Sequence, residues 1–424
     1  MSKNRIVAGI ELGSSKISTL ISQVGVEPST NETTVNIIGV ASVESKGIKK
    51  GQIVNIEEAV EATIASVEAA ERMAGYNLDS AFISIGGAHV HSQNSHGVVA
   101  ISDPEGEISN EDVIRVIEAA SAISLPQSRE VIHVLPREYI VDGESGVKDP
   151  IGMSGIRLEV DTHIVTAASP AVKNINKAVN EVGINIEDLV FSAYAASEAV
   201  LTSTEKELGC VLIDVGGGTT SIAVFIDGAL SYSGVIPIGA KNVTNDLAIG
   251  LRVSLESAEK IKHALSLDAK KKAKIKEESG DDLDLTVLGI TETKMVSKKT
   301  LVEGIIRPRL NEIFTMVKIE LDRAGVSNRI PSGAVITGGG AETVGIVDSA
   351  RRTLALPVRV GVPFGVRGLI DDVITPAFSV CVGLILCGIK MEPKQNLNSF
   401  SKKFKLPSIG VVGKLIDTIK NLLP

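Results

Sequence analysis

The chain contains the same arrangement twice: a strand, an acidic residue, a turn of small residues and a second strand. Residues 6–21 read IVAGIELGSSKISTLI and residues 210–225 read CVLIDVGGGTTSIAVF. The acidic residues, Glu11 and Asp214, each stand two positions before a glycine, and they lie 203 residues apart. Short apolar runs rich in β-branched residues are typical of strands. The sequence therefore predicts an α/β fold with an internal duplication.

The turns inside the two hairpins are built from residues that suit phosphate binding. Glycine has no Cβ, so it allows tight turns and a close approach of backbone N–H groups to a ligand. A carboxylate at the end of the strand can face a hydrated Mg²⁺. One such hairpin could equally be structural, but two predict a nucleotide held between two halves. The predicted phosphate ligands are Gly13, Ser14, Ser15, Lys16, Gly216, Gly217, Gly218 and Thr219.

A third glycine turn, made by Gly338, Gly339 and Gly340, follows the strand-like stretch 334–337. Its order, strand then glycines then helix, predicts a loop under a nucleotide base or ribose. The three turns resemble the phosphate-1, phosphate-2 and adenosine motifs of the actin and heat-shock-chaperone ATPase superfamily. Within it, the stretches IELGSSKI, LGCVLIDVGGGTTSIAVF, EGIIRPR and ITGGGAE most resemble the bacterial FtsA family of cell-division proteins.

The resemblance extends from about Arg5 to the C-terminus, and it implies the fold. That fold is a duplicated actin-like ATPase core of two ribonuclease-H-like halves, with an inserted α+β subdomain called 1C and a C-terminal amphipathic helix. The expected division is subdomain 1A from residues 1–83, 164–193 and 358–391, subdomain 1C from 84–163, subdomain 2A from 194–237 and 301–357, subdomain 2B from 238–300, a linker at 392–407 and the amphipathic helix at 408–424.

The resemblance also implies ATP and Mg²⁺ as cofactors. Glu11 and Asp214 would order the waters of the metal, and either is placed to orient an attacking water. Glu259 and Lys262 stand three residues apart on a predicted helix. In the resembling chaperones such a pair holds adenosine, as the third glycine turn would. The plain alternative for this pair is a surface ion pair of little energetic value.

The predicted helix at residues 191–201 corresponds to the connecting helix of the superfamily. Actin has a glutamine there that positions the attacking water. This segment contains neither glutamine nor histidine, and Glu198 is its only charged residue. Hydrolysis is therefore expected to be slow at most, while binding of ATP is still expected.

Charge and composition exclude several classes of protein. The formal net charge is −8 and the isoelectric point is about 5.5, so a nucleic acid is not an expected partner. The three cysteines lack CxxC spacing and lie in apolar segments, which predicts buried thiols in a reducing compartment. The N-terminus runs straight into a strand, which argues against a signal peptide. No apolar run reaches the length of a membrane span.

Local signals predict several further features. Asn55 is expected to begin a helix that ends near Gly75. His89 and His91 alternate on a predicted strand, where a solvated or contact surface is favoured over a metal site because no Cys or carboxylate lies at ligand spacing. The charged segment 270–284 is expected to be an exposed loop.

The C-terminal stretch 408–423 follows a lysine-rich linker and has one apolar helical face. This pattern favours a membrane anchor at the interface with anionic lipid. The alternative is a terminal helix that docks on the body of the protein. The predicted membrane-facing residues are Ile409, Val412, Leu415, Ile416, Ile419, Leu422 and Leu423.

Taken as a whole, the resemblance implies a protein that polymerises and tethers the ring of the tubulin-like protein FtsZ to the cytoplasmic face of the bacterial inner membrane at the division site. The C-terminal peptide of FtsZ would bind subdomain 2B, other division proteins would bind 1C, and copies of the chain would form a filament. Two alternatives stay open: an actin-like protein of type IV pilus assembly, and a small-metabolite kinase of the same superfamily, which would need a catalytic Asp facing a substrate pocket.

Overall fold

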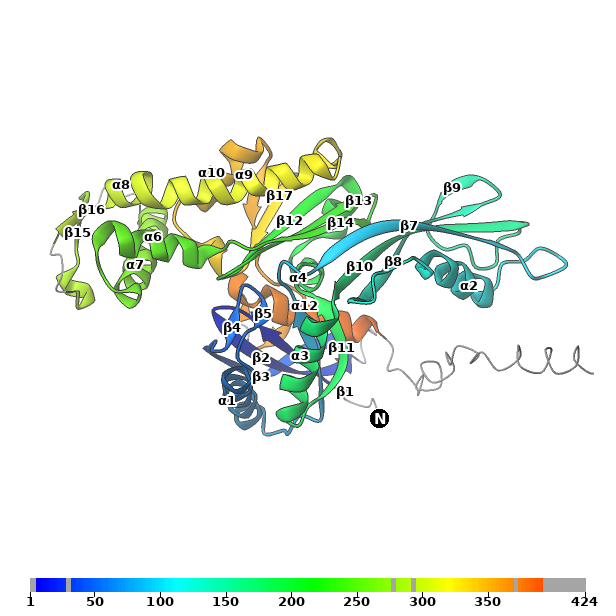
Figure 1. The fold of residues 1–424 in the computed structure, drawn as a ribbon, viewed down its shortest axis with the longest axis horizontal. Coiled ribbons are helices and arrows are strands. Elements are labelled where there is room, and N and C mark those ends of the chain that lie inside the picture. The colour runs from blue at the N-terminus through cyan, green and yellow to red at the C-terminus, as the bar shows by residue number, and fades with distance from the viewer. Residues whose placement is uncertain (1–4, 28–31, 276–279, 291–294, 370–372, 392–424) are drawn as a thin grey trace, which may run out of the picture.

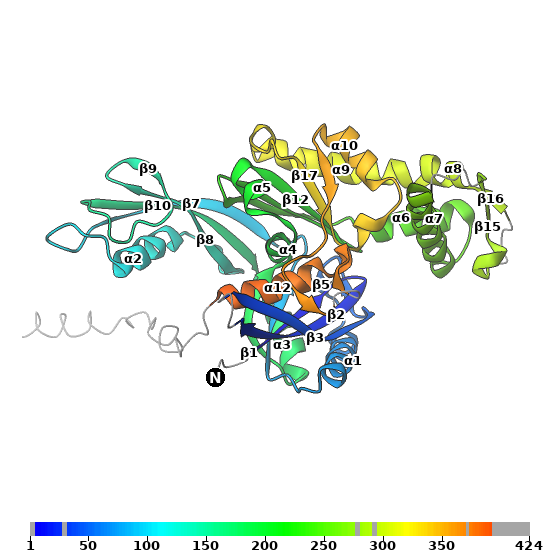
Figure 2. The same cartoon turned by 180° about the vertical axis from the view of Figure 1, so that it is seen from behind.

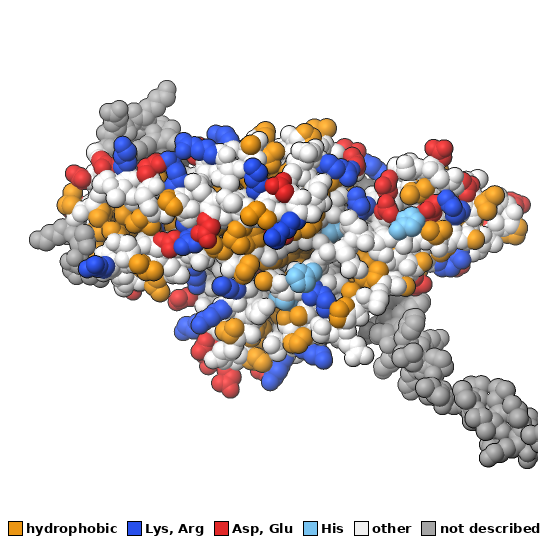
Figure 3. Space-filling model, turned by 45° about the horizontal axis from the view of Figure 1, so that its top comes forward, with side chains coloured by type: hydrophobic (Ala, Val, Ile, Leu, Met, Phe, Trp, Pro, Cys, Tyr) orange, Lys and Arg blue, Asp and Glu red, His pale blue; other side chains and the backbone are white. Residues whose placement is uncertain are grey.

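The molecule is elongated, with two central sheets and one lobe at each end of its long axis (Figures 1 and 2). Acidic and basic side chains alternate over the face shown in Figure 3, and that face carries no continuous basic surface. The structure is a computed structural model that describes residues 5–27, 32–275, 280–290, 295–369 and 373–391.

The first half is built on a six-stranded sheet with helices on both faces. Gly39 lies against α1 and Gly9 lies against α12, because neighbouring rows of side chains point to opposite faces of the sheet. The strands in spatial order are β11 (Asn185–Phe191), β6 (Ser80–Ile85), β1 (Arg5–Leu12), β2 (Lys16–Val26), β3 (Thr33–Glu44) and β19 (Arg367–Gly368). The helices are α1 (Ile56–Ala74), α3 (Ser169–Glu181), α4 (Ser192–Val200) and α12 (Ser379–Lys390).

The second half repeats this plan with five strands. Leu212 of β12 packs into the core of the first half, while Ile213 points to the opposite face and the core of the second half. The strands in spatial order are β14 (Ala229–Ile236), β13 (Thr220–Ile226), β12 (Cys210–Val215), β17 (Ala334–Thr337) and β18 (Val358–Val360). The helices are α5 (Ser203–Leu208), α6 (Ala240–Leu251), α9 (Arg307–Arg323) and α10 (Ile346–Leu354).

The duplication seen in the sequence is confirmed by the hydrogen bonds of the two hairpins. In the first, the N–H of Gly13 donates to the carbonyl of Lys16 over 3.1 Å; in the second, Gly216 donates to Thr219 over 2.9 Å. Both donors and both acceptors are 203 residues apart, as are the strand pairs that flank each turn. The two halves therefore share a turn geometry as well as a sequence pattern.

The inserted module forms a separate four-stranded antiparallel sheet with one helix. Ser109 and Asp112 make a capping box at the start of that helix. Leu158 and Val160 of the central strand point to the helix and form a small core. The elements are β7 (His91–Ala100), β10 (Arg157–Ala168), β8 (Arg129–Val141), β9 (Glu144–Val147) and α2 (Asn110–Ser121).

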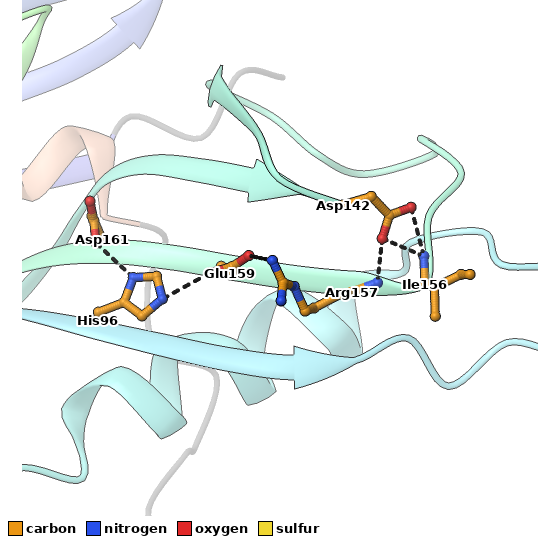
Figure 4. Close-up of polar contacts among 6 residues, drawn as sticks. All are labelled: His96, Asp142, Ile156, Arg157, Glu159 and Asp161. Atoms are coloured by element: carbon orange, nitrogen blue, oxygen red, sulfur yellow. Dashed lines mark hydrogen bonds and ion pairs between the residues drawn. The ribbon is translucent and has the colours of Figure 1, made fainter.

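The opposite face of this sheet carries a chain of charged side chains (Figure 4). The ring of His96 bonds through Nδ1 to Asp161 over 2.8 Å and through Nε2 to Glu159 over 3.0 Å. Glu159 also forms an ion pair with Arg157, with 2.6 Å between a guanidinium nitrogen and a carboxylate oxygen. These hydrogen bonds and charges, the bond to Asp161 first, raise the pKa of His96. The network joins β7 to β10 on the face opposite α2.

The inserted module also docks on the second half, although it belongs to the first half in sequence. Ser92 Oγ donates to the carbonyl of Ser233 on the edge strand β14 over 2.7 Å. The ring of His163 lies between Asn94 and the hydroxyl of Ser233, at 2.7 Å and 2.9 Å, and it is almost fully buried. Burial lowers the pKa of His163 to about 3, so the ring bridges the two halves in its neutral form.

The lobe at the other end of the molecule is mostly helical. Arg309 makes a bidentate ion pair with Asp246, so this arginine holds α9 to α6 and has a structural role. The predicted loop at 270–284 is wrong, because the helix that contains Glu259 continues to Ile275 and residues 282–284 form a strand. The elements are α7 (Leu255–Ile275), β15 (Asp282–Asp284), β16 (Met295–Ser297), α8 (Lys298–Leu301) and the π-helical turn η2 (Val302–Ile306).

Several other predictions can be compared with the structure. The helix that begins at Asn55 ends at Gly75 in the left-handed conformation, as expected. All three cysteines are buried and free. The prediction for His89 is wrong: it lies before β7 and is buried, and its carbonyl accepts a hydrogen bond from Arg129. The linker and the amphipathic stretch 408–424 lie outside the described residues.

Candidate nucleotide-binding cleft

The two phosphate hairpins face each other across the boundary between the halves. A Cβ added to Gly217 would lie 2.7 Å from the Cβ of Ser15, and one added to Gly218 would lie 3.0 Å from the Cβ of Ser14. A Cβ at 2.7 Å would force a shift of the neighbouring atoms, and one at 3.0 Å would be closer than most real Cβ contacts. Glycine is therefore required here by the close approach of the two turns.

In the second hairpin, two carbonyls of the turn accept hydrogen bonds from α6, while the N–H groups of the turn remain open to a ligand. The first turn of α6 donates to it, from Ala240 to the carbonyl of Gly216 and from Lys241 to that of Gly217, both over 2.9 Å. Among the residues that the structure describes, no acceptor receives the N–H groups of Gly217, Gly218 or Thr219. Such a turn is a concave anion-binding site.

Two carboxylates lie at the bottom of the cleft. Burial raises the pKa of Glu11, and burial followed by the charge of Glu11 raises the pKa of Asp214 to about 7, while Lys16 opposes both shifts. Each acid ends the first strand of its hairpin, so their proximity follows from the duplication. A buried pair of this kind is costly to ionise without a cation.

Lys16 supplies a positive charge to the same place. Its ammonium group is buried without a hydrogen-bond partner among the described residues, and it lies 3.7 Å from the centre of the Phe378 ring. A buried ammonium group without a hydrogen-bond acceptor is unfavourable unless an anion binds to it. The lysine is thus placed to contact a phosphate group.

The third glycine turn packs against the second hairpin. A Cβ on Gly338 would lie 2.3 Å from a carboxylate oxygen of Asp214, and φ at this residue is +82°. Across the cleft, Lys262 donates to Glu259 over 2.8 Å and to Thr244 over 2.9 Å. Glu259 and Lys262 therefore belong to a partly buried hydrogen-bond network at the cavity and do not form an isolated surface ion pair.

One cavity of about 240 Å³ collects nearly all of the predicted site residues. It is lined by both acids, by the three turns and by Glu259 and Lys262; of the predicted set only Gly218 is not part of the lining. Their roles toward a ligand stay predictions. Helical spacing from Glu259 could have added His263 and Ser266, but most of the missed residues carry no local signal. The polar or charged lining residues that were not predicted as ligands are Ser84, Ser192, Ser221, Lys241, His263, Ser266, Glu342 and Thr343.

Glu198, which had no assigned role, is part of a structural contact. Its carboxylate is buried and binds Lys206 over 2.7 Å and also Lys390 at the end of α12. It does not line the cavity. Ser192 of the same helix does line it, but no glutamine or histidine from α4 does so. The helix thus offers no acid or base for activating water.

Comparisons with known proteins agree with this architecture. A model described as the SHS2 domain inserted in FTSA matches residues 87–166, and a model for cell division protein FtsA matches residues 211–383. A cell division protein FtsA of Pseudomonas aeruginosa is 39% identical over 388 residues, which make up 92% of this chain and 90% of that protein. The chain belongs to the FtsA family. The predicted resemblance is thereby confirmed, and the inserted module is the SHS2 domain of that family.

Solved structures show the same fold at much lower identity. The PilM–PilN type IV pilus biogenesis complex matches with a TM-score of 0.62 and 17% identity, over 90% of this chain and 98% of that chain. MreB 5 of Spiroplasma citri bound to AMPPNP matches with a TM-score of 0.52 and 14% identity, over 91% and 97% of the two chains. At these identities the likeness shows the fold alone, and it confirms the actin-like core of this FtsA-family chain.

The buried acids predict an unusual dependence of stability on pH. The raised pKa of Asp214 means that ionisation costs more in the folded than in the unfolded chain. The contribution of Asp214 to stability without ligand is therefore fully present below about pH 4 and is lost as the pH rises through about 7. Asp214→Asn removes this cost. At pH 8 the variant should therefore have a higher free energy of unfolding than wild type, by up to about 4 kcal/mol.

The measurement is chemical denaturation from pH 4 to pH 8 without nucleotide or divalent metal. The difference between Asp214→Asn and wild type should vanish at the acidic end. Glu144→Gln, at an exposed acid in the SHS2 domain, is the control and should leave the pH profile unchanged. An Asp214→Asn protein that is no more stable than wild type at pH 8 would contradict the explanation.

Proposed function

We propose that this FtsA-family protein binds ATP between its two halves, and that its output is an assembly state. The observation that carries the proposal is the convergence of two duplicated hairpins on one cavity. Both turns present N–H groups, Lys16 is buried without a partner, and the third glycine turn closes the same cavity. Nucleotide phosphates would accept hydrogen bonds from the turn N–H groups and from Lys16 at the same time. Gly338–Gly340, Glu259 and Lys262 would hold the adenosine.

The donor set also fits Mg²⁺ held through water. Glu11 and Asp214 are hard oxygen ligands, and burial raises the pKa of both, so a bound cation would favour their ionised forms. Magnesium would neutralise phosphate charge when bound, and the two carboxylates would orient its waters. Any hydrolysis would be slow, because α4 contributes no glutamine or histidine to the cavity to position an attacking water.

The wider role that we propose follows the family. The chain would polymerise and tether the FtsZ ring to the cytoplasmic face of the inner membrane at the division site. The lobe with α7 and β15 would bind the C-terminal peptide of FtsZ, and the SHS2 domain would bind other division proteins. The amphipathic stretch 408–424 would lie in the membrane surface. Among the helices that the structure describes, none combines the length and the apolar composition of a membrane-spanning segment.

The proposal can be tested on lipid monolayers that contain anionic lipid. With ATP and Mg²⁺, wild-type protein should form filaments in electron micrographs, because many weakly binding tails act together. Ile416→Glu places a charge in the middle of the predicted apolar face and should abolish attachment while ATP binding remains. A protein that stays monomeric with ATP, or an Ile416→Glu variant that binds the monolayer like wild type, would contradict the corresponding part.

A further inference from the structure

A lysine outside the three motifs spans the cleft between the halves. Lys241 is the second residue of α6, and its ammonium group donates to the carbonyl oxygen of Ser14 in the first hairpin over 2.9 Å. Its own backbone N–H donates to the carbonyl of Gly217 in the second hairpin over 2.9 Å. One residue is therefore bound to both turns, to one through its main chain and to the other through its side chain.

The partner of this ammonium group is a neutral carbonyl. Lys262, another lysine of the cavity lining, is bound to Glu259, and Lys16 lies deeper, over the ring of Phe378. No carboxylate in the described part of the chain forms an ion pair with Lys241. The attraction between opposite charges adds to a hydrogen bond from an ammonium group to an anion, and it is absent from a bond to a neutral carbonyl. An anion between the turns could thus attract Lys241 away from Ser14 without breaking an ion pair.

The backbone of Lys241 is rigidly placed for this exchange. A Cβ at the preceding Gly239 would lie 2.5 Å from the carbonyl of Gly216, so the start of α6 is packed directly on the second hairpin. The side chain itself is exposed at the rim of the cavity that it lines. Only the flexible end of the side chain has to move, and the remaining geometry is fixed by the helix.

We propose that Lys241 is a phosphate ligand supplied by the second half, and that it makes binding depend on the number of phosphates. The inference rests on the proposed ATP site. Because the interaction is electrostatic, the contribution of Lys241 should grow with the charge of the phosphate chain. Removal of the lysine should weaken the binding of ATP most, weaken the binding of ADP less and leave the binding of adenosine unchanged. The side chain is exposed, so the loss for ATP should be about tenfold, at the lower end for a charged hydrogen bond.

Calorimetry with ATP, ADP and adenosine in Mg²⁺ buffer tests this. Lys241→Ala and Lys241→Gln should both lower the affinity for ATP by about tenfold. Lys241→Arg should retain most of the affinity because it keeps the charge. Lys173→Ala removes an exposed lysine of α3 that does not line the cavity, and it controls for net charge. The unfolding midpoint without nucleotide should be the same in all four variants.

The possible failures are distinguishable. An equal loss for adenosine and ATP in Lys241→Ala, or no loss for ATP, would overturn the role of Lys241 and leave the proposed ATP site standing. Full affinity in Lys241→Gln would also overturn it, because glutamine can still donate to Ser14 but carries no charge. A wild-type protein that binds none of the nucleotides would overturn both proposals together.

Discussion

Gly217→Val is expected to lower ATP affinity by about a hundredfold or more. The added Cβ alone would lie 2.7 Å from the Cβ of Ser15, and the two branches of valine need further room. The hairpins would have to separate, and the loss of two hydrogen bonds to phosphate, at about 1.5 kcal/mol or more each, corresponds to a hundredfold or more. Titration calorimetry with ATP and Mg²⁺ measures the loss directly.

A matched control is available at Gly304. It lies in an exposed helical turn and its Cβ would have no atom within 4 Å, so Gly304→Val should bind ATP like wild type. The effect of Gly217→Val should be local, so its circular dichroism spectrum should stay native. ATP affinity within threefold of wild type in the folded Gly217→Val protein would show that the phosphates do not lie between these turns.

Gly383→Ala is expected to destabilise the protein by about 3 kcal/mol or more, which is a large part of a typical folding free energy. Gly383 is in α12, where it crosses α4. A Cβ at this position would lie 1.8 Å from the carbonyl oxygen of Ala195 and 2.3 Å from its carbon. Backbone atoms cannot yield as the end of a flexible side chain can, so the two helices would be forced apart.

Helix propensity gives the opposite sign for this substitution. Alanine is favoured over glycine inside a helix by about 1 kcal/mol, so local structure alone predicts a more stable protein. Chemical denaturation of Gly383→Ala and of Gly304→Ala as control decides between the two. We expect a clear loss in Gly383→Ala and a small gain or no change in the control. A stabilised Gly383→Ala protein would mean that α4 and α12 are not in backbone contact.

The substitutions at Gly217 and Gly383 also separate two kinds of information in the sequence. Gly217 belongs to a turn that the sequence could identify, because the turn repeats at a fixed offset and contains consecutive glycines. Gly383 lies in an apolar helix, and nothing within that segment shows that its glycine meets another helix almost 200 residues earlier in the chain. The requirement for glycine there is a tertiary contact.

The duplicated hairpins, the third glycine turn and the helix cap at Asn55 could be predicted from the sequence alone. These features depend on residues a few positions apart, so periodicity, turn chemistry and capping are sufficient to predict them. The same information, with the family resemblance, placed Glu11, Asp214 and the phosphate turns in one site, and the structure brings them to one cavity. The continuation of α7 to Ile275 was missed, because charge composition predicted a loop there.

Which distant groups meet could not be learned from the sequence but could be learned from the folded structure. It buried His89, gave Glu198 two lysine partners, and docked the SHS2 domain on β14 through Ser92 and His163. It also brought the ammonium group of Lys241 to the first hairpin, across 227 residues of sequence. Such contacts depend on how separately predictable elements pack, and packing is set by the shapes of surfaces that no short stretch of sequence contains.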